Sequence, residues 1–149
     1  MEQAQIVSVN ISSTKGVVKK PVSEGCLEPE VGMVGDAHSG PWHRQLSLLA
    51  QESIDFMRAQ GAKVNPGDFA ENVTTQGIEL HTLPVGTRLK LGDVEVEVTQ
   101  IGKKCHAGCA IRELVGDCIM PREGIFVRVL NPGTVRAGDL VHRLDGEGG

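Results

Sequence analysis

The chain has 149 residues, a net charge of −4 and a hydrophobic fraction of 40%, which together are typical of one ordinary soluble domain. The mild acidity, without any block of like charges, argues against nucleic acid as the main partner. No apolar run approaches the ~18 residues that a membrane span needs, and the N-terminus lacks a signal-peptide pattern. We therefore expect a cytoplasmic protein with no membrane partner, whose four cysteines stay reduced.

The chain is predicted to begin with two strands. Residues 5–12 alternate apolar and polar side chains, and residues 17–22 form a return strand in which Pro21 limits pairing. Residues 31–45 are then rich in glycine and polar groups and include the single tryptophan. Such a loop lets the backbone approach a ligand, although a surface loop that only plugs the edge of the core has the same composition.

A strand and the clearest helix follow. Residues 45–50 predict a short strand, and residues 51–60 predict a helix that ends at Gly61. The helix carries Phe56 and Met57, which we assign to the core.

Two further segments predict a turn and a hairpin. Residues 65–75 turn into a strand, and there Glu71 and Asn72 either bind a ligand or brace the turn. Residues 81–101 predict a β-hairpin with a Gly92-Asp93 turn and with the valines of its second strand on one face.

The last part of the chain predicts more short elements. Residues 109–116 have the period of a short helix, and residues 124–130 and 138–144 predict strands. The glycine-rich tail, residues 144–149, is expected to be disordered. Many short strands, one firm helix and no linker predict that residues 1–149 form a single mostly-β domain, a barrel.

The hairpin leads directly to a cluster of thiols and basic residues. Cys105 is flanked by Lys103, Lys104 and His106, an arrangement that lowers the pKa of a thiol and makes a thiolate available to attack or to bind a soft metal. The alternative is a strand end with solvated lysines and inert, buried cysteines.

Zinc is a second alternative for the same cluster. Cys105, Cys109 and Cys118, together with His106, offer enough ligands for a tetrahedral site, but the spacing matches no paired-CxxC knuckle. Phosphate-loop, dinucleotide, nucleophile-elbow and HExxH signatures are absent from the sequence.

Three ordered blocks carry a family resemblance. The first is Gly35-Asp36-x-His38-x-Gly40 with Arg44-Gln45-x-Ser47-Leu48. The second is Pro66-Gly67-Asp68-Phe69-x-Glu71-Asn72, with Gly77-Ile78-x-Leu80 and Leu83-x-Val85-Gly86. The third is Gln100-x-Gly102-x-x-Cys105, then Arg122-Glu123-Gly124-Ile125-Phe126 and Val135-Arg136-x-Gly138-Asp139. From about Ile6 to Leu144 this order resembles the MOSC domain, named for the C-terminal domain of molybdenum cofactor sulfurase.

The resemblance implies a mostly-β, barrel-like fold of the pyruvate-kinase-barrel type with one or two short helices. It also implies handling of the molybdenum cofactor, a pyranopterin dithiolene carrying phosphate, or transfer of sulfur. The family's characteristic cysteine matches Cys105, which in relatives such as the mitochondrial amidoxime-reducing component is a direct molybdenum ligand. Here Lys104 stands where the family commonly has proline, and without an aminotransferase-like domain no pyridoxal phosphate is expected.

These observations lead to one main hypothesis and two alternatives. The main hypothesis is a protein of molybdopterin cofactor biosynthesis or maturation that binds a molybdenum or tungsten cofactor, with Cys105 as the catalytic thiol and as metal ligand or sulfur carrier. Its partners would be a sulfur donor, cofactor biosynthesis proteins or a molybdoenzyme. The alternatives are a small metal- or partner-binding module and an enzyme, either a sulfur transferase or a cofactor-dependent reductase of N-hydroxylated compounds.

The residues that would bind the cofactor fall into two groups. Basic side chains suit the pterin phosphate and the ring edges, and the candidates are His38, Arg44, Lys103, Lys104 and Arg122. The polar residues that would orient the pterin, or those side chains, are Asp36, Glu71 and Asn72.

Overall fold

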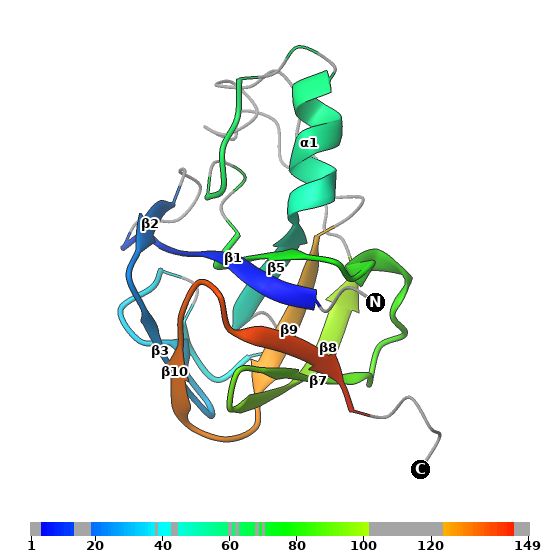
Figure 1. Cartoon of the computed structure of the whole chain (residues 1–149). Coiled ribbons are helices and arrows are strands. Elements are labelled where there is room, and N and C mark those ends of the chain that lie inside the picture. Colours follow the sequence, from blue (N-terminus) through cyan, green and yellow to red (C-terminus); the bar gives the residue numbers. More distant parts are fainter. Residues whose placement is uncertain are drawn as a thin grey trace.

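Short strands make up most of the protein, as the alternating sequence predicts (Figure 1). The computed structural model describes residues 4–13, 19–37, 39–42, 45–59, 61, 63–67, 69, 71–101 and 124–144. In chain order its elements are β1 (Ala4–Ile11), β2 (Lys20–Val22), β3 (Gly25–Glu28), β4 (Gly32–Met33), β5 (Leu46–Ala50), α1 (Gln51–Ala59), β6 (Val73–Gln76), the 3₁₀ turn η1 (Leu80–Thr82), β7 (Arg88–Leu91), β8 (Val94–Ile101), β9 (Ile125–Val129), β10 (Gly133–Val135) and β11 (Leu140–Arg143). The predicted mostly-β fold class is confirmed.

A closed barrel organises these strands. Its spatial order is β11-β7-β8-β9-β5-β6-β1, and the ring closes because β11 pairs antiparallel with β1, with Ala4 opposite Val141 and Gln5 opposite Leu140. The blue β1 and the red β11 run across the front of the barrel in Figure 1. The short β2 pairs with the other end of β1, with Val9 opposite Val22. The predicted barrel is therefore confirmed.

The β7–β8 hairpin shows how the sequence pattern fills the core. In β8 the residues Val94, Val96 and Val98 are buried, whereas the alternate residues are only partly so. Leu91 and Leu89 of β7 stand opposite Val94 and Val96 and are also buried. Because successive side chains of a strand point to opposite faces, the alternating sequence places one valine face inside the barrel, as predicted.

Helix α1 connects two parallel strands. β5 and β6 pair in parallel, with Leu48 opposite Val73, and a parallel pair needs a crossover connection, to which α1 contributes. Met57 is buried as predicted, but Phe56 is 50% exposed, so its assignment to the core is wrong. Adjacent helical residues point about 100° apart, and Ile54 and Met57 occupy the inward face three residues apart, which turns Phe56 outward.

A small second sheet was not predicted from the sequence. It consists of β10, β3 and β4 in that order, and Figure 1 shows β3 and β10 side by side at the edge of the barrel. Each strand has between two and four residues, too few for an alternating pattern to be recognised.

Two sequence predictions about helices and the tail concern residues outside the described ranges. The short helix predicted at residues 109–116 lies outside them, and so do residues 145–149 of the predicted tail. Leu144, the first residue of that tail, is described, and its N–H donates to Arg88 O at 2.9 Å. Within the described ranges, no helix has the length and apolarity required to span a membrane.

Candidate functional site

The structure describes only part of the predicted site. Asp36, Glu71 and Asn72 lie within the described ranges. The other predicted residues lie outside them, namely His38, Arg44, Lys103, Lys104, Cys105 and Arg122. Cys109 and Cys118, which the zinc alternative would need, also lie outside them. The contacts of all these residues therefore stay predictions.

Four strand ends meet at the barrel edge from which the chain continues toward Cys105. Ile101, the last residue of β8, stands opposite Ile125 of β9, and Ile125 stands opposite Leu48 of β5. On the other side of β5, Ala50 stands opposite Thr75 of β6. The C-terminal ends of β5, β6 and β8 and the beginning of β9 thus share one edge, at which α1 also begins.

A cavity of about 570 Å³ opens at this edge, between α1 and the segment that follows β6. Its lining includes Glu52 and Phe56 of α1, and Ile78, Glu79 and His81 of the following segment. Glu52 Oε2 accepts a hydrogen bond from Gly77 N at 2.9 Å, which joins the two walls. The volume falls within the roughly 300–1,000 Å³ typical of small-molecule sites, and the half-exposed Phe56 provides an apolar surface.

A second cavity, of about 420 Å³, lies beside the outer face of β8. Trp42, Val85 and Arg128 contribute to its lining. The Arg128 guanidinium is held by Glu97, with Nε and Nη2 at 2.7 and 2.6 Å from Oε1. An anion in this cavity would therefore compete with Glu97 for the guanidinium.

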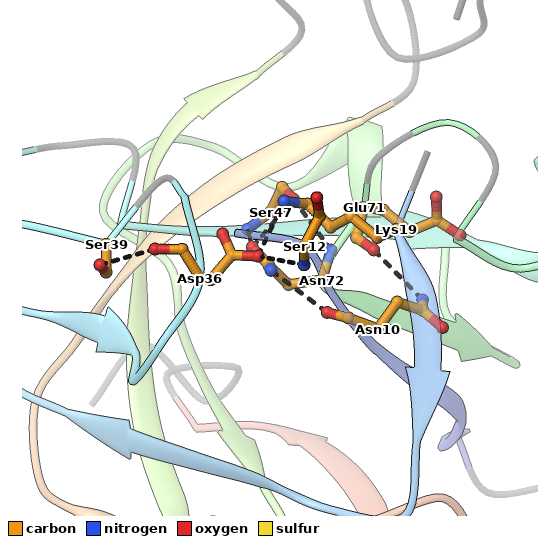
Figure 2. A network of polar contacts seen from close by, with 8 residues as sticks. All are labelled: Asn10, Ser12, Lys19, Asp36, Ser39, Ser47, Glu71 and Asn72. Carbon is orange, nitrogen blue, oxygen red and sulfur yellow. Dashed lines mark hydrogen bonds and ion pairs between the residues drawn. The ribbon is translucent and has the colours of Figure 1, made fainter. Parts of the chain in front are cut away.

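Asp36 is buried and faces inward (Figure 2). Its Oδ1 lies 2.8 Å from Lys19 Nζ and also accepts from Ser12 N at 3.1 Å. Its carbonyl oxygen accepts from Ser39 Oγ at 2.7 Å. A buried charge is stable only when it is paired, so the Lys19 ammonium allows Asp36 to anchor the beginning of the glycine-rich loop.

Asn72 joins three strands. Its Oδ1 accepts from Ser47 N and Ser47 Oγ at 3.0 and 3.2 Å, and its Nδ2 donates to Asn10 O at 3.3 Å. Asn72 N donates to Ser47 Oγ at 3.0 Å, and Asn10 N donates to Asn72 O at 2.7 Å. Asn72 therefore fixes β5 and β1 next to the beginning of β6, and its side chain is fully buried.

Glu71 is also fully buried. Its Oε2 accepts from Gly67 N at 2.8 Å and from Thr74 Oγ1 at 2.7 Å. Burial raises the pKa of the Glu71 carboxyl to about 7, because the ionised form loses its hydration. The Thr74 hydroxyl and the backbone N–H groups of Gly67, Glu71 and Phe69 oppose this rise. The group therefore titrates near neutral pH.

Together these three residues form an internal polar network rather than an open cluster. Figure 2 shows them with Asn10, Lys19 and Ser47, side chains whose roles no sequence pattern indicates. Their contacts within the described residues are those of bracing groups, one of the two roles that the sequence allows for Glu71 and Asn72. Direct contact of Asp36, Glu71 and Asn72 with a cofactor stays a prediction. Nowhere in the described ranges do three or more His, Cys, Asp or Glu residues gather as metal ligands would.

Solved structures with the same fold are known. The YuaD protein of Bacillus subtilis is similar with a TM-score of 0.77 and 21% sequence identity, over 96% of this chain and 97% of that chain. YiiM of Geobacillus stearothermophilus is similar with a TM-score of 0.70 and 20% identity, over 95% and 75% of the two chains. YiiM of Escherichia coli has a TM-score of 0.69 and 20% identity, over 97% and 70%. At these identities the likeness shows the fold alone.

Sequence comparison supplies the family. No curated protein matches the chain significantly. A sequence model of the MOSC domain matches residues 35–142, which include all three blocks of the resemblance. This family is associated with the molybdenum cofactor in general. The protein therefore belongs to the MOSC domain family and is a molybdenum-cofactor-related domain.

Proposed function

We propose that the protein binds a molybdenum or tungsten cofactor through the Cys105 thiolate and acts in the biosynthesis or maturation of molybdopterin cofactor. The observation that carries this proposal is the common edge of β5, β6, β8 and β9, where a cavity of about 570 Å³ opens. Cys105 follows Ile101 by four residues, so covalent geometry keeps it within about 14 Å of that strand end. Ile101 and Leu48 are separated by two strand spacings, or about 10 Å.

The described lining of the cavity fits one part of the cofactor. Pterin rings present amino and N–H donors, and the carboxylates of Glu52 and Glu79 accept such donors. Phe56 offers a face on which a flat ring can pack. The described lining contains no lysine or arginine, so the anionic phosphate requires the predicted basic residues Arg44 and Arg122 or their neighbours.

The roles of the chain's own residues follow from this arrangement. The cofactor, when bound, supplies a thiophilic metal centre. Cys105 provides the soft thiolate for that metal, or carries sulfur as a persulfide, and Lys103 and Lys104 favour its ionised form. His38, Arg44 and Arg122 hold the phosphate, while Asp36 and Asn72 keep the loop and the strands that carry this site in place. A sulfur donor, a biosynthesis protein or a molybdoenzyme is the expected partner.

Substitution of Cys105 tests the thiolate. Wild-type protein expressed with molybdate is expected to retain molybdenum and pterin through purification, and Cys105→Ser is expected to lose both, because a hydroxyl is a poor ligand for a soft metal. Cys26→Ser is the matched control, since Cys26 is an exposed thiol in the small second sheet, and it should behave as wild type. Equal molybdenum content in wild type and Cys105→Ser would contradict the proposal.

The open cavity also favours an enzymatic version of the same site, in which the bound cofactor reduces N-hydroxylated compounds. Phe56 and the two glutamates would then face a flat substrate with N–H donors. Protein loaded with molybdenum cofactor and a reductant should turn over hydroxylaminopurine, and absence of turnover leaves the carrier role. A purely structural metal module using Cys105, Cys109 and Cys118 would instead show stoichiometric zinc that Cys109→Ser removes.

We also infer that residues 1–149 form one MOSC domain in the cytoplasm, with neither nucleic acid nor membrane as partner. Two findings support the single domain. β1 and β2 precede residue 35, where the family match begins, yet both pair within the main sheet. The likeness to the Bacillus subtilis protein spans 96% of the chain. The cytoplasmic assignment rests on the four cysteines, which a reducing compartment keeps free.

A further inference from the structure

One oxygen of the Glu71 carboxyl is buried without compensation. Oε2 accepts from Gly67 N and from Thr74 Oγ1, at 2.8 and 2.7 Å. Oε1 is equally buried, and it has no hydrogen-bond partner among the described residues. A neutral carboxyl costs less in this position than an ionised one, because an ionised carboxylate would place charge on a buried oxygen that accepts no hydrogen bond.

Gly67 connects this carboxyl to a buried ion pair. Gly67 donates its N–H to Glu71, and its carbonyl oxygen accepts from Lys19 N at 2.7 Å. Gly67 has φ +92°, and a Cβ there would overlap Lys19 O, so the two backbones are in direct contact. Lys19 Nζ in turn lies 2.8 Å from Asp36 Oδ1, which also accepts from Ser12 N. A continuous path of short contacts therefore runs from Glu71 through Gly67 and Lys19 to Asp36.

The charges along this path are few. Among the described residues, the buried charged side chains besides Glu71 are Lys19, before β2, and Asp36, on the loop after β4, and these two pair with each other. Lys20 and Lys63, on the same segments, are exposed. The facing side chains of β1 and β6, Asn10 and Thr74, are uncharged. Burial raises the pKa of the Glu71 carboxyl to about 7, so its charge changes near neutrality.

We propose that Glu71 is a proton-operated positioning residue, whose change of charge shifts the Val64–Gly67 turn and, through Gly67, the segment that carries the Lys19–Asp36 pair. Ionisation strengthens the hydrogen bond from Gly67 N to Oε2 and places negative charge on the buried Oε1, which draws water or a neighbouring donor toward the carboxylate and displaces Gly67. Because Gly67 touches Lys19 directly, the displacement reaches the ion pair that anchors the glycine-rich loop. This device needs no bound cofactor, so it goes beyond the proposed function and does not depend on it.

Nuclear magnetic resonance of the full-length protein without cofactor tests the proposal. Between about pH 5.5 and about pH 8.5, the backbone amide signals of Gly67, Lys19 and Ser12 are expected to move with one shared midpoint near 7. In Glu71→Gln, an isosteric side chain that mimics the neutral carboxyl, these signals should keep their low-pH positions throughout the range. Identical titration in Glu71→Gln would overturn the proposal. A titration confined to Gly67, with Lys19 and Ser12 unchanged, would equally overturn it.

Further variants test whether the shared midpoint belongs to Glu71. Thr74→Val removes one donor that favours the ionised carboxyl, so the midpoint should rise by about one pH unit, and an unchanged midpoint contradicts the proposal even if Glu71→Gln fails to fold. His81→Gln and His142→Gln, which remove the histidines among the described residues, are control variants. Both should leave the midpoint of the Gly67 signal where it is, and its loss in either variant would assign the titration to that histidine.

Discussion

At the scale of single residues, buried polar side chains connect the loops and strands around the candidate site. The family blocks singled out Asp36, Glu71 and Asn72, and all three are buried with specific internal partners. A loop or a turn has no period, so no pattern told whether these side chains faced a ligand or the interior. Lys19 could not be predicted as the partner of Asp36, because a lysine between two apolar stretches is normally solvated.

Gly67 and Gly61 form a natural pair of tests. Both have positive φ, +92° and +101°, but only at Gly67 would a Cβ meet backbone, namely Lys19 O. Gly61→Ala should therefore lower the unfolding free energy by about 1–2 kcal/mol, which is the cost of placing a residue with a Cβ in the left-handed backbone conformation. Gly67→Ala should cost about 3 kcal/mol or more, because the chain must also move apart. Urea unfolding of the two variants measures the difference, and equal losses would contradict the described contact.

Glu71 should give the fold a characteristic pH dependence. A carboxyl whose pKa is raised by folding, from 4.5 to about 7, stabilises the fold below 4.5, and this contribution is lost as the pH rises through about 7. The loss amounts to about 3 kcal/mol at alkaline pH. Wild type should therefore lose about 2–3 kcal/mol relative to Glu71→Gln between about pH 5 and about pH 8.5 in urea unfolding. If the unfolding free energies of the two proteins change with pH in parallel, folding does not raise the pKa of the Glu71 carboxyl.

At the scale of elements, period and length decided what could be predicted. β8 and α1 carry regular patterns over enough residues, and their predicted bounds are close to the observed ones. The first strand of the predicted hairpin is shorter than expected, because residues 80–82 form the 3₁₀ turn η1 and β7 begins at Arg88. The strands β3, β4 and β10 are too short to show an alternating pattern. They are defined by their pairing with one another, since β3 pairs with both β10 and β4. In α1 the buried face consists of Ser53, Ile54 and Met57, and Phe56 lies outside it, contrary to the prediction.

The two faces of α1 should separate stability from binding. Met57→Ala is expected to cost about 2–4 kcal/mol, because a buried side chain is lost from the contact with the barrel. Phe56→Ala should change the unfolding free energy by less than about 1 kcal/mol, since the ring is half exposed. The same variant removes the apolar wall of the larger cavity and should weaken retention of the pterin. Thermal unfolding and pterin content measure the two effects; comparable destabilisation by both variants would contradict the burial difference.

At the scale of the whole molecule, the fold class was predictable and the arrangement was not. Many short strands with tight turns indicated a barrel, but no local pattern states that β5 pairs with β9 or that β1 meets β11. Such pairings join residues far apart in sequence, and they are chosen by the shared burial of inward faces. Resemblance to the MOSC family predicted the family to which the chain belongs, which residue patterns alone could not do, and the family match confirms this membership.

Truncation tests the closure of the barrel. A chain ending at Ala137 lacks β11 and leaves the edges of β1 and β7 unpaired. It should lose cooperative thermal unfolding and should self-associate, because open edges recruit other strands. A chain ending at Leu144 retains every described strand and should unfold as the full-length protein does. Size-exclusion chromatography and thermal unfolding distinguish the two; a monomeric, cooperative shorter chain would show that closure is dispensable.

Closure of the ring by its first and last strands also governs how the protein is made. Of the described strands, β1 leaves the ribosome first and β11, which covers part of its edge, leaves last. At about 5–20 residues per second, the more than one hundred residues between them separate the two strands by roughly 6–26 s. Throughout that interval the nascent sheet exposes an edge that any neighbouring nascent chain can extend. Slower translation lengthens this exposure, so yield of native protein should depend on translation rate and on chaperones that shield nascent chains.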